Sequence, residues 1–88
     1  MAQITKNSLA GQTDVHFMEM ALEEARQAAR EGEIPVGAVL VREGRVVARN
    51  HNRREQDRDA TAHAEVLVLR EACRQLGRWR LSDTALYV

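Results

Sequence analysis

A histidine and a glutamate lie two residues apart in the segment Thr61-Ala62-His63-Ala64-Glu65. A neutral imidazole is a common zinc ligand, and a carboxylate beside a zinc site can move the protons of an activated water without binding the metal. Thr61 offers an N-cap, which would place both side chains in the first turn of a helix. The pair therefore indicates metal-assisted hydrolysis, but His-x-Glu also occurs by chance in many helices.

A catalytic zinc ion needs three protein ligands, and the other soft ligands here are few. Cys73 is ten residues from His63, about 15 Å along a helix, whereas zinc bonds are about 2.0 to 2.3 Å long. Cys73 cannot share an ion with His63 on one straight helix, and its apolar neighbours predict a small buried side chain. His16 and His51 form no ligand spacing with His63. From these residues alone, a structural and a catalytic role of His63 both stay open.

The elements that would position this pair begin with a helix. Residues 1–12 have no apolar period and are expected to form a flexible lead-in, after which Thr13 or Asp14 offers an N-cap. Gly32 is a typical C-terminal stop. One narrow apolar face consists of Met18, Ala21, Leu22, Ala25, Ala28 and Ala29. The small size of its alanines predicts close packing against a flat surface such as a sheet.

Two strands and a loop follow this helix. The apolar run of residues 36–41 predicts a buried strand, residues 42–45 a turn, and residues 46–48 a second strand, which together form a hairpin. The polar residues 49–60 predict a loop long enough to have a function. His51 lies in this loop, where it could line a pocket or simply contribute to the polarity of the loop.

A second helix and a third strand complete the pattern. The helix is expected to start at the Thr61 cap and to end at Gly77, with Val66, Leu69, Ala72 or Cys73, and Leu76 on its apolar face. Residues 85–88 read as a strand. The order helix, hairpin, helix, strand predicts an α/β fold in which both helices pack against one sheet.

Composition limits the class of protein further. Eighty-eight residues make at most one small domain, and 13 basic against 13 acidic side chains argue against a strongly basic nucleic-acid binder. The single cysteine suits a reducing compartment, and no apolar run is long enough to cross a membrane. We therefore expect a cytoplasmic protein. No Gly-x-Gly-x-x-Gly or Walker-type loop indicates a phosphate site.

Four stretches carry a resemblance to a known family. Residues 59–65 resemble the zinc-site signature of the cytidine deaminase superfamily, in which His-x-Glu is followed by Pro-Cys-x-x-Cys. Residues 33–39, residues 52–55, and residues 76–81 together with 86–88 resemble its bacterial tRNA adenosine deaminase branch. The resemblance runs from about Phe17 to Val88. It implies the N-terminal portion of a three-layer α/β/α fold, with residues 13–88 as the first part of a zinc-dependent deaminase domain.

The resemblance also implies roles for individual residues. His63 corresponds to the histidine zinc ligand and Glu65 to the proton shuttle, while Asn52 would contact the flipped nucleoside and Val36 would form part of the pocket wall. The implied reaction is attack of an activated water on C6 of adenine, which yields inosine at the wobble position of a tRNA. The implied partners are one zinc ion, a tRNA anticodon stem-loop and a second copy of the chain in a homodimer.

Two departures from the family pattern affect these expectations. Ala60 stands where the family usually has proline, which should loosen the loop slightly. The chain stops at Val88, ahead of the expected Pro-Cys-x-x-Cys motif, so two cysteine ligands would follow it. The 88-residue chain alone is therefore expected to be inactive and to leave an unpaired edge on its third strand. Two alternatives stay open: a deaminase of free guanine or cytosine, and a truncated non-catalytic interaction module.

Overall fold

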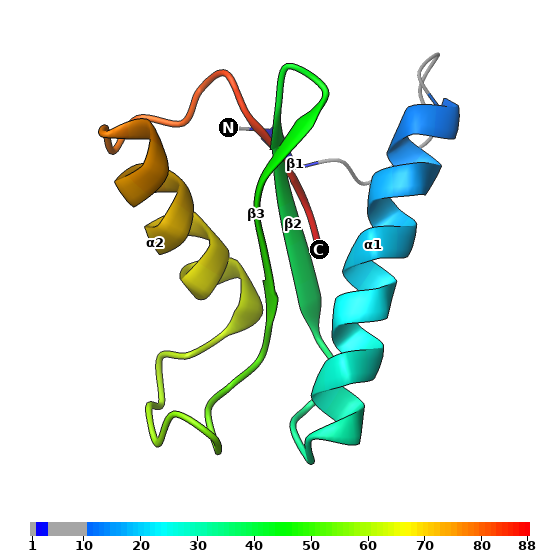
Figure 1. Cartoon of the computed structure of the whole chain (residues 1–88), viewed down its shortest axis with the longest axis vertical. Helices are drawn as coiled ribbons and strands as arrows, with labels where there is room; N and C mark the ends of the chain where they lie inside the picture. Colours follow the sequence, from blue (N-terminus) through cyan, green and yellow to red (C-terminus); the bar gives the residue numbers. More distant parts are fainter. Residues whose placement is uncertain (1, 4–10) are drawn as a thin grey trace.

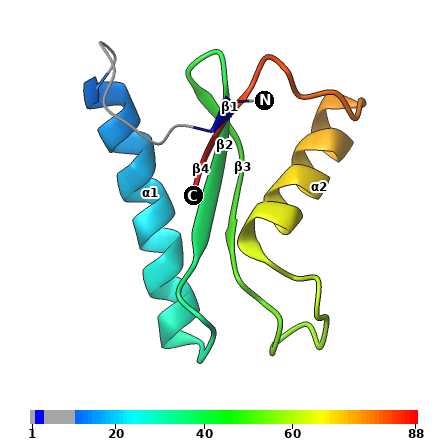
Figure 2. The ribbon, with the colours of Figure 1, turned by 180° about the vertical axis from the view of Figure 1, so that it is seen from behind.

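The computed structural model describes residues 2–3 and 11–88, which form a helix–sheet–helix sandwich. The elements are β1 (Ala2–Gln3), α1 (Gly11–Arg30), β2 (Gly37–Arg42), β3 (Arg45–His51), α2 (Ala64–Leu76) and β4 (Ala85–Tyr87). One mixed sheet has the strand order β1-β4-β2-β3. Helices α1 and α2 cover opposite faces of this sheet in Figure 1, and the view from behind in Figure 2 shows the same three layers. The expected α/β/α order is confirmed.

Strand β2 is the centre of the molecule because both of its faces are buried. Ala38 and Leu40 belong to the apolar cluster on the α2 side, which also contains Val68. Val39 and Val41 belong to the cluster on the α1 side. This arrangement explains why residues 36–41 read as a continuous apolar run instead of an alternating one.

The small residues of α1 allow the helix to lie very close to β2. A Cβ atom built on Gly37 would lie 2.1 Å from the backbone oxygen of Ala21 and 2.6 Å from the backbone nitrogen of Ala25. Only a glycine fits at this point of contact. The expectation that the alanine face packs against a sheet is thus confirmed, and the contact fixes the distance between α1 and the start of β2.

Replacing Gly37 by alanine should push α1 away from the sheet. We expect the free energy of unfolding to fall by about 1 to 3 kcal/mol or more, since the added methyl group meets backbone atoms that cannot move independently. Denaturant unfolding followed by circular dichroism measures this change. Gly44→Asn is the matched control, because Gly44 has open space around it and asparagine tolerates its positive φ. Equal stability of the Gly37→Ala variant and the unchanged protein would contradict the close contact.

The hairpin turn consists of two residues, and β3 is longer than the sequence predicted. Glu43 and Gly44 both have positive φ angles, of 53° and 74°, as a two-residue type I′ turn requires. At the other end, β3 continues to His51, since Asn50 and His51 pair with β2. The polar residues 49–51, expected in a loop, are therefore part of the sheet.

The N-terminal region differs from its expected description where it can be described. Residues 1 and 4–10 of the expected lead-in lie outside the described residues. Helix α1 begins at Gly11, before the expected cap at Thr13 or Asp14. Ala2 and Gln3 pair in parallel with Ala85 and Leu86 of β4. The outer edge of β4, expected to be unpaired, is therefore paired at these two positions.

Candidate active site

The N-cap position of α2 is His63, two residues later than the expected Thr61, and the capping side chain comes from outside the helix. His63 occupies the N-cap position with no side-chain cap bond. Thr61, the expected cap, instead donates its backbone N–H and its hydroxyl to Asp59 Oδ1, at 2.8 and 2.7 Å. The prediction of Thr61 as the cap is wrong, because an aspartate two residues earlier captures its hydroxyl in a local turn.

The actual cap is Asn52, which follows the end of β3. Its Oδ1 accepts a hydrogen bond from the backbone N–H of Ala64 at 2.8 Å, and its own N–H donates to Val36 O at 3.1 Å. Only 3% of Asn52 is exposed. The structure thus brings Val36 and Asn52 to the N-terminal end of α2, where His63 and Glu65 flank Ala64.

Glu65 has the one buried side-chain polar atom without a hydrogen-bond partner in the described part of the chain, its Oε1. Leaving such an atom unsatisfied is costly, and in native proteins it commonly marks a place where a ligand or a water binds. The positive end of the α2 dipole favours an anion here. His63, two residues earlier, is exposed and available for a ligand. The geometry fits a carboxylate that acts on a bound water beside an imidazole ligand.

The described residues do not by themselves complete a zinc site. No group of three histidine, cysteine, aspartate or glutamate side chains within residues 2–3 and 11–88 could hold a metal ion. Cys73 lies in the last turn of α2, half-buried, with its Sγ 3.8 Å from Trp79 O. His63 and Cys73 therefore occupy opposite ends of one helix, as their spacing predicted. His63 fits the role of one ligand among several.

The loop between β3 and α2 is anchored at both ends and in its middle. Arg53 N–H donates to Ala62 O at 3.0 Å, which closes the loop. The Glu33 carboxylate, 7% exposed, accepts the backbone N–H groups of Glu55 and Gln56 at 3.2 and 2.9 Å. Glu33 is a positioning residue that the sequence did not reveal, because its partners lie more than twenty residues away.

Glu33→Gln should weaken this anchor while preserving the size of the side chain. One of the two accepting oxygens becomes an N–H₂ group that faces a backbone donor, so we expect a loss of about 1 to 3 kcal/mol in unfolding free energy. Amide hydrogen exchange of Glu55 and Gln56 measures the local effect. Glu43→Gln, at an exposed turn position, serves as the control. Unchanged exchange at both amides would show that Glu33 does not hold the loop.

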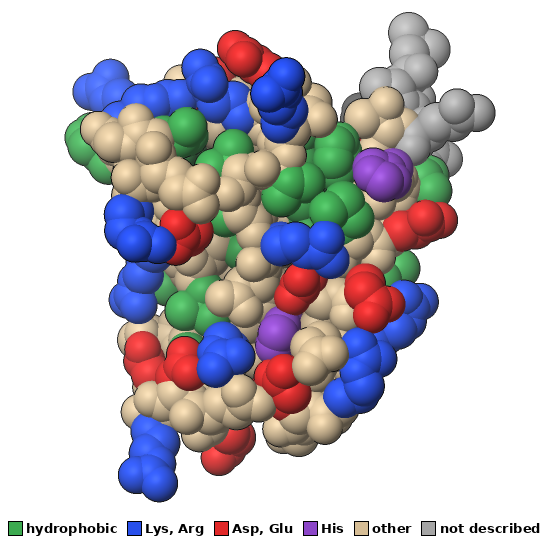
Figure 3. Space-filling model, in the orientation of Figure 1, with side chains coloured by type: hydrophobic (Ala, Val, Ile, Leu, Met, Phe, Trp, Pro, Cys, Tyr) green, Lys and Arg blue, Asp and Glu red, His purple; other side chains and the backbone are tan. Residues whose placement is uncertain are grey.

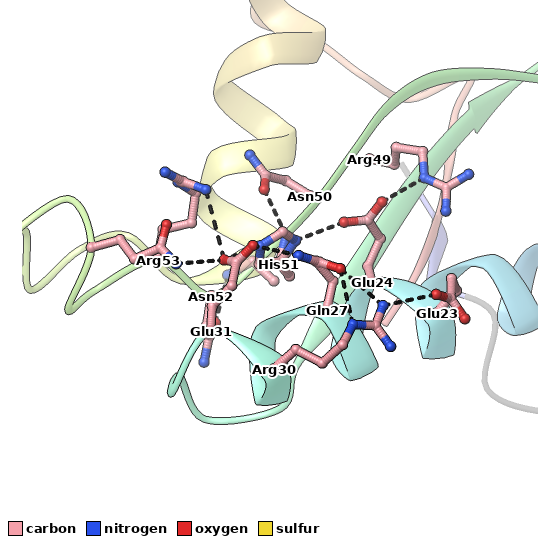
Figure 4. Close-up of polar contacts among 12 residues, drawn as sticks. Glu23, Glu24, Gln27, Arg30, Glu31, Arg49, Asn50, His51, Asn52 and Arg53 are labelled. Carbon is pink, nitrogen blue, oxygen red and sulfur yellow. Dashed lines mark hydrogen bonds and ion pairs between the residues drawn. The ribbon is translucent and has the colours of Figure 1, made fainter.

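The other two histidines have different surroundings. His16 is exposed at the surface, and its ring lies 5.2 Å from that of Phe17. His51 is buried at the end of β3, and its ring lies between Glu24 of α1 and Glu31, the residue that follows α1 (Figure 4). These glutamates are seven residues apart, two helical turns on one face, a spacing that could have indicated a shared partner.

Comparison with known proteins agrees with this geometry. Residues 11–88 match the model of the cytidine and deoxycytidylate deaminase zinc-binding region, and the chain belongs to this family. It is 51% identical over 75 residues to the tRNA-specific adenosine deaminase of Bacillus subtilis (strain 168), an alignment that covers 85% of this chain and 47% of that protein. The chain spans about half the length of the curated relatives it matches.

Solved structures give the same relationship. One, from biochemical and structural studies of A-to-I editing by tRNA:A34 deaminases at the wobble position of transfer RNA, superimposes with a TM-score of 0.80. It is 55% identical, and the match covers 83% of this chain and 56% of that one. A guanine deaminase from Bacillus subtilis has a TM-score of 0.79 at 38% identity, and the match covers 83% of this chain and 47% of that one.

Proposed function

We propose that the chain is the N-terminal part of a zinc-dependent deaminase domain that converts adenosine to inosine at the wobble position of tRNA. The observation that carries this proposal is the buried, unpartnered Oε1 of Glu65 beside the exposed His63 at the start of α2. The similarity to tRNA-specific adenosine deaminases supports the choice of substrate. Residues 13–88 would form the first part of the domain.

Each proposed site residue has a distinct task. His63 would bind zinc through its imidazole, together with two cysteines from a following segment. Zinc supplies an activated water for attack on C6 of adenine. Glu65 would accept one proton from that water and deliver it to N1 of the base, and would then transfer the second proton to the amino group, so that ammonia leaves as the C6 carbonyl forms. Asn52 would contact the nucleoside while it caps α2, and Val36 would line the pocket wall.

The setting proposed for this reaction is the cytoplasm, where the complete protein would act as a homodimer. None of the helices in the described part of the chain is long and apolar enough to span a bilayer. Analytical ultracentrifugation measures the oligomeric state.

Basic and acidic side chains are interspersed over the face shown in Figure 3.

Inosine formation in an anticodon stem-loop tests the proposal. The complete zinc-loaded protein should convert the wobble adenosine of an RNA hairpin, and a hairpin with guanosine at that position is the control substrate. Mass spectrometry detects the product, because exchange of an amino group for an oxygen changes the mass of the base. Zinc-loaded protein that leaves the adenosine hairpin unchanged would contradict the proposal.

A free-base deaminase is the second candidate function. It is supported by the similarity to the guanine deaminase of Bacillus subtilis in both fold and sequence. Turnover of guanine and cytosine, measured in parallel with the RNA hairpin, separates the two candidates. We expect the hairpin to be the preferred substrate, and faster turnover of guanine would favour the second candidate.

A further inference from the structure

His51 is held by two carboxylates at once. Its Nδ1 lies 2.7 Å from Glu24 Oε1 and its Nε2 lies 2.9 Å from Glu31 Oε1. Figure 4 shows the ring between the two carboxylates. Only 7% of His51 is exposed. An ionised carboxylate can only accept hydrogen bonds, so both ring nitrogens must donate, and the ring must be an imidazolium. We call Glu24, His51 and Glu31 the histidine clamp.

Glu24, the first carboxylate of the histidine clamp, is held in place by Arg49 of β3. The second carboxylate oxygen of Glu24 accepts a hydrogen bond from Arg49 Nε at 2.6 Å. Arg49 and His51 lie on the same strand, two residues apart, so they point to the same face of the sheet and share one carboxylate. Glu24 is largely buried, with 17% of its side chain exposed.

Glu31, the second carboxylate of the histidine clamp, contacts the loop between β3 and α2. Glu31 Oε1 accepts a hydrogen bond from Gln56 Nε2 at 2.8 Å and lies 3.9 Å from Arg53 NH1. Its other oxygen accepts from Gln27 Nε2 at 2.7 Å. Within residues 11–88, no further ion pair or hydrogen bond joins the ring of His51 to a side chain of α2, β2 or β4. The charged groups around the ring are thus Glu24 of α1, Glu31 just after α1, and the nearby Arg49 and Arg53.

The clamp is one residue away from the candidate active site. Asn52 follows His51 directly, and its Oδ1 accepts the N–H of Ala64 at 2.8 Å. Ala64 lies between His63 and Glu65. A shift in the end of β3 would therefore move the asparagine that caps α2, and with it the first turn that carries both candidate site residues.

We propose that His51, protonated and held between Glu24 and Glu31, is a positioning residue that fixes Asn52 and the first turn of α2 for catalysis. The catalytic part of this inference rests on the proposed deaminase function. The structural part, that His51 holds Asn52, does not. Loss of the proton from His51 leaves one glutamate facing a ring nitrogen without a hydrogen, and the clamp opens on that side.

The direction of the pH dependence follows from the surroundings of the ring. Burial alone would lower the pKa of His51, but the hydrogen bonds to Glu24 and Glu31 outweigh it and raise the pKa above its ordinary value of 6.5. The folded protein then binds this proton more tightly than the unfolded chain. The stabilisation is complete below about pH 6.5 and is lost as the pH rises through the pKa of the folded state. We therefore expect the end of β3 and the first turn of α2 to become less ordered as the pH rises above the pKa of His51 in the folded protein.

Glu31→Gln in the complete zinc-loaded protein tests the inference. By NMR, the His51 ring and the Asn52 side-chain amide should titrate with one shared midpoint in the unchanged protein. The variant should move both midpoints to lower pH, by roughly one unit for the loss of one adjacent charge. The alkaline limb of kcat for inosine formation should move with them, with little change in KM. Glu23→Gln, on an exposed part of the same helix, should leave every midpoint in place.

Substitution of the histidine itself gives a second test. His51→Gln should lower kcat about tenfold or more through misplacement of the site, and it should abolish the titration of the Asn52 amide. His16→Gln, at an exposed position, should change neither. If Glu31→Gln fails to fold, Glu24→Gln on the other ring nitrogen provides the same measurement.

Two results would overturn the inference. One is an Asn52 amide whose midpoint stays fixed while that of the His51 ring moves. The other is an active variant whose alkaline limb of kcat is unchanged despite a lowered ring midpoint. If the unchanged protein makes no inosine, the proposed function fails, and the ring and amide titrations still decide whether His51 positions Asn52.

Discussion

Glu65→Gln is expected to slow inosine formation by the complete protein at least about a hundredfold, because the amide cannot accept and return a proton. The same change should leave the zinc content unaffected, since Glu65 is proposed to act on the water and not to bind the metal. It should also change the free energy of unfolding little, because Glu65 Oε1 has no hydrogen-bond partner that the substitution would remove. Rate assays, metal analysis and denaturant unfolding measure these three quantities.

His63→Ala is the contrasting variant for this experiment. It should lower both the zinc content and the rate, because it removes the one ligand that this part of the chain is proposed to provide. If Glu65→Gln lost zinc in proportion to activity, Glu65 would be a ligand and the division of roles would be wrong. If the Glu65→Gln variant kept its zinc, its stability and its full rate of inosine formation, Glu65 would have no role in the mechanism.

The second large effect is expected at Asn52, which combines a structural and a proposed binding role. Asn52→Ala removes the acceptor for Ala64 N–H and leaves a buried donor unsatisfied, so the free energy of unfolding should fall by about 1 to 3 kcal/mol. Inosine formation should be lost as well, since the first turn of α2 would no longer be held. Denaturant unfolding and the hairpin assay measure the two losses.

Asn52→Asp separates the two roles. The aspartate keeps an oxygen that accepts the N–H of Ala64, and a negative charge is favourable at a helix N-terminus. The free energy of unfolding of Asn52→Asp should therefore exceed that of Asn52→Ala. The aspartate loses the side-chain N–H₂ donor, so nucleoside binding should still weaken, seen as a raised KM. Equal KM values for Asn52→Asp and the unchanged protein would limit Asn52 to its structural role.

The parts of this fold that could be predicted from sequence are those set by local patterns. The apolar spacing of α1, the continuous apolar run of β2 and the stop at Gly77 depend on nearby residues, and the structure has them in the expected order. Likewise, a separation of ten residues along one helix suffices to place His63 and Cys73 apart. Such features need no knowledge of distant contacts.

The features that could not be predicted depend on partners far along the chain. Thr61 has the right chemistry for a cap, but the N–H of Ala64 is bound by Asn52, twelve residues earlier. His51 reads as a polar loop residue, and only the packing of α1 and the residue after it brings Glu24 and Glu31 to its ring. In both cases the sequence shows a side chain that can form hydrogen bonds, but its partner depends on which distant residues the tertiary fold places beside it.

The anchored loop has a consequence for how the sequence of this protein can vary. The bonds from Arg53 to Ala62 and from Asn52 to Ala64 hold its two ends together, so chain-closure entropy changes only slowly with the number of residues between them. Insertions or exchanges at the tip, near Arg58, should therefore leave the ends in place. A scaffold of this kind allows the tip of the loop to vary in sequence while the proposed site residues at its base keep their geometry.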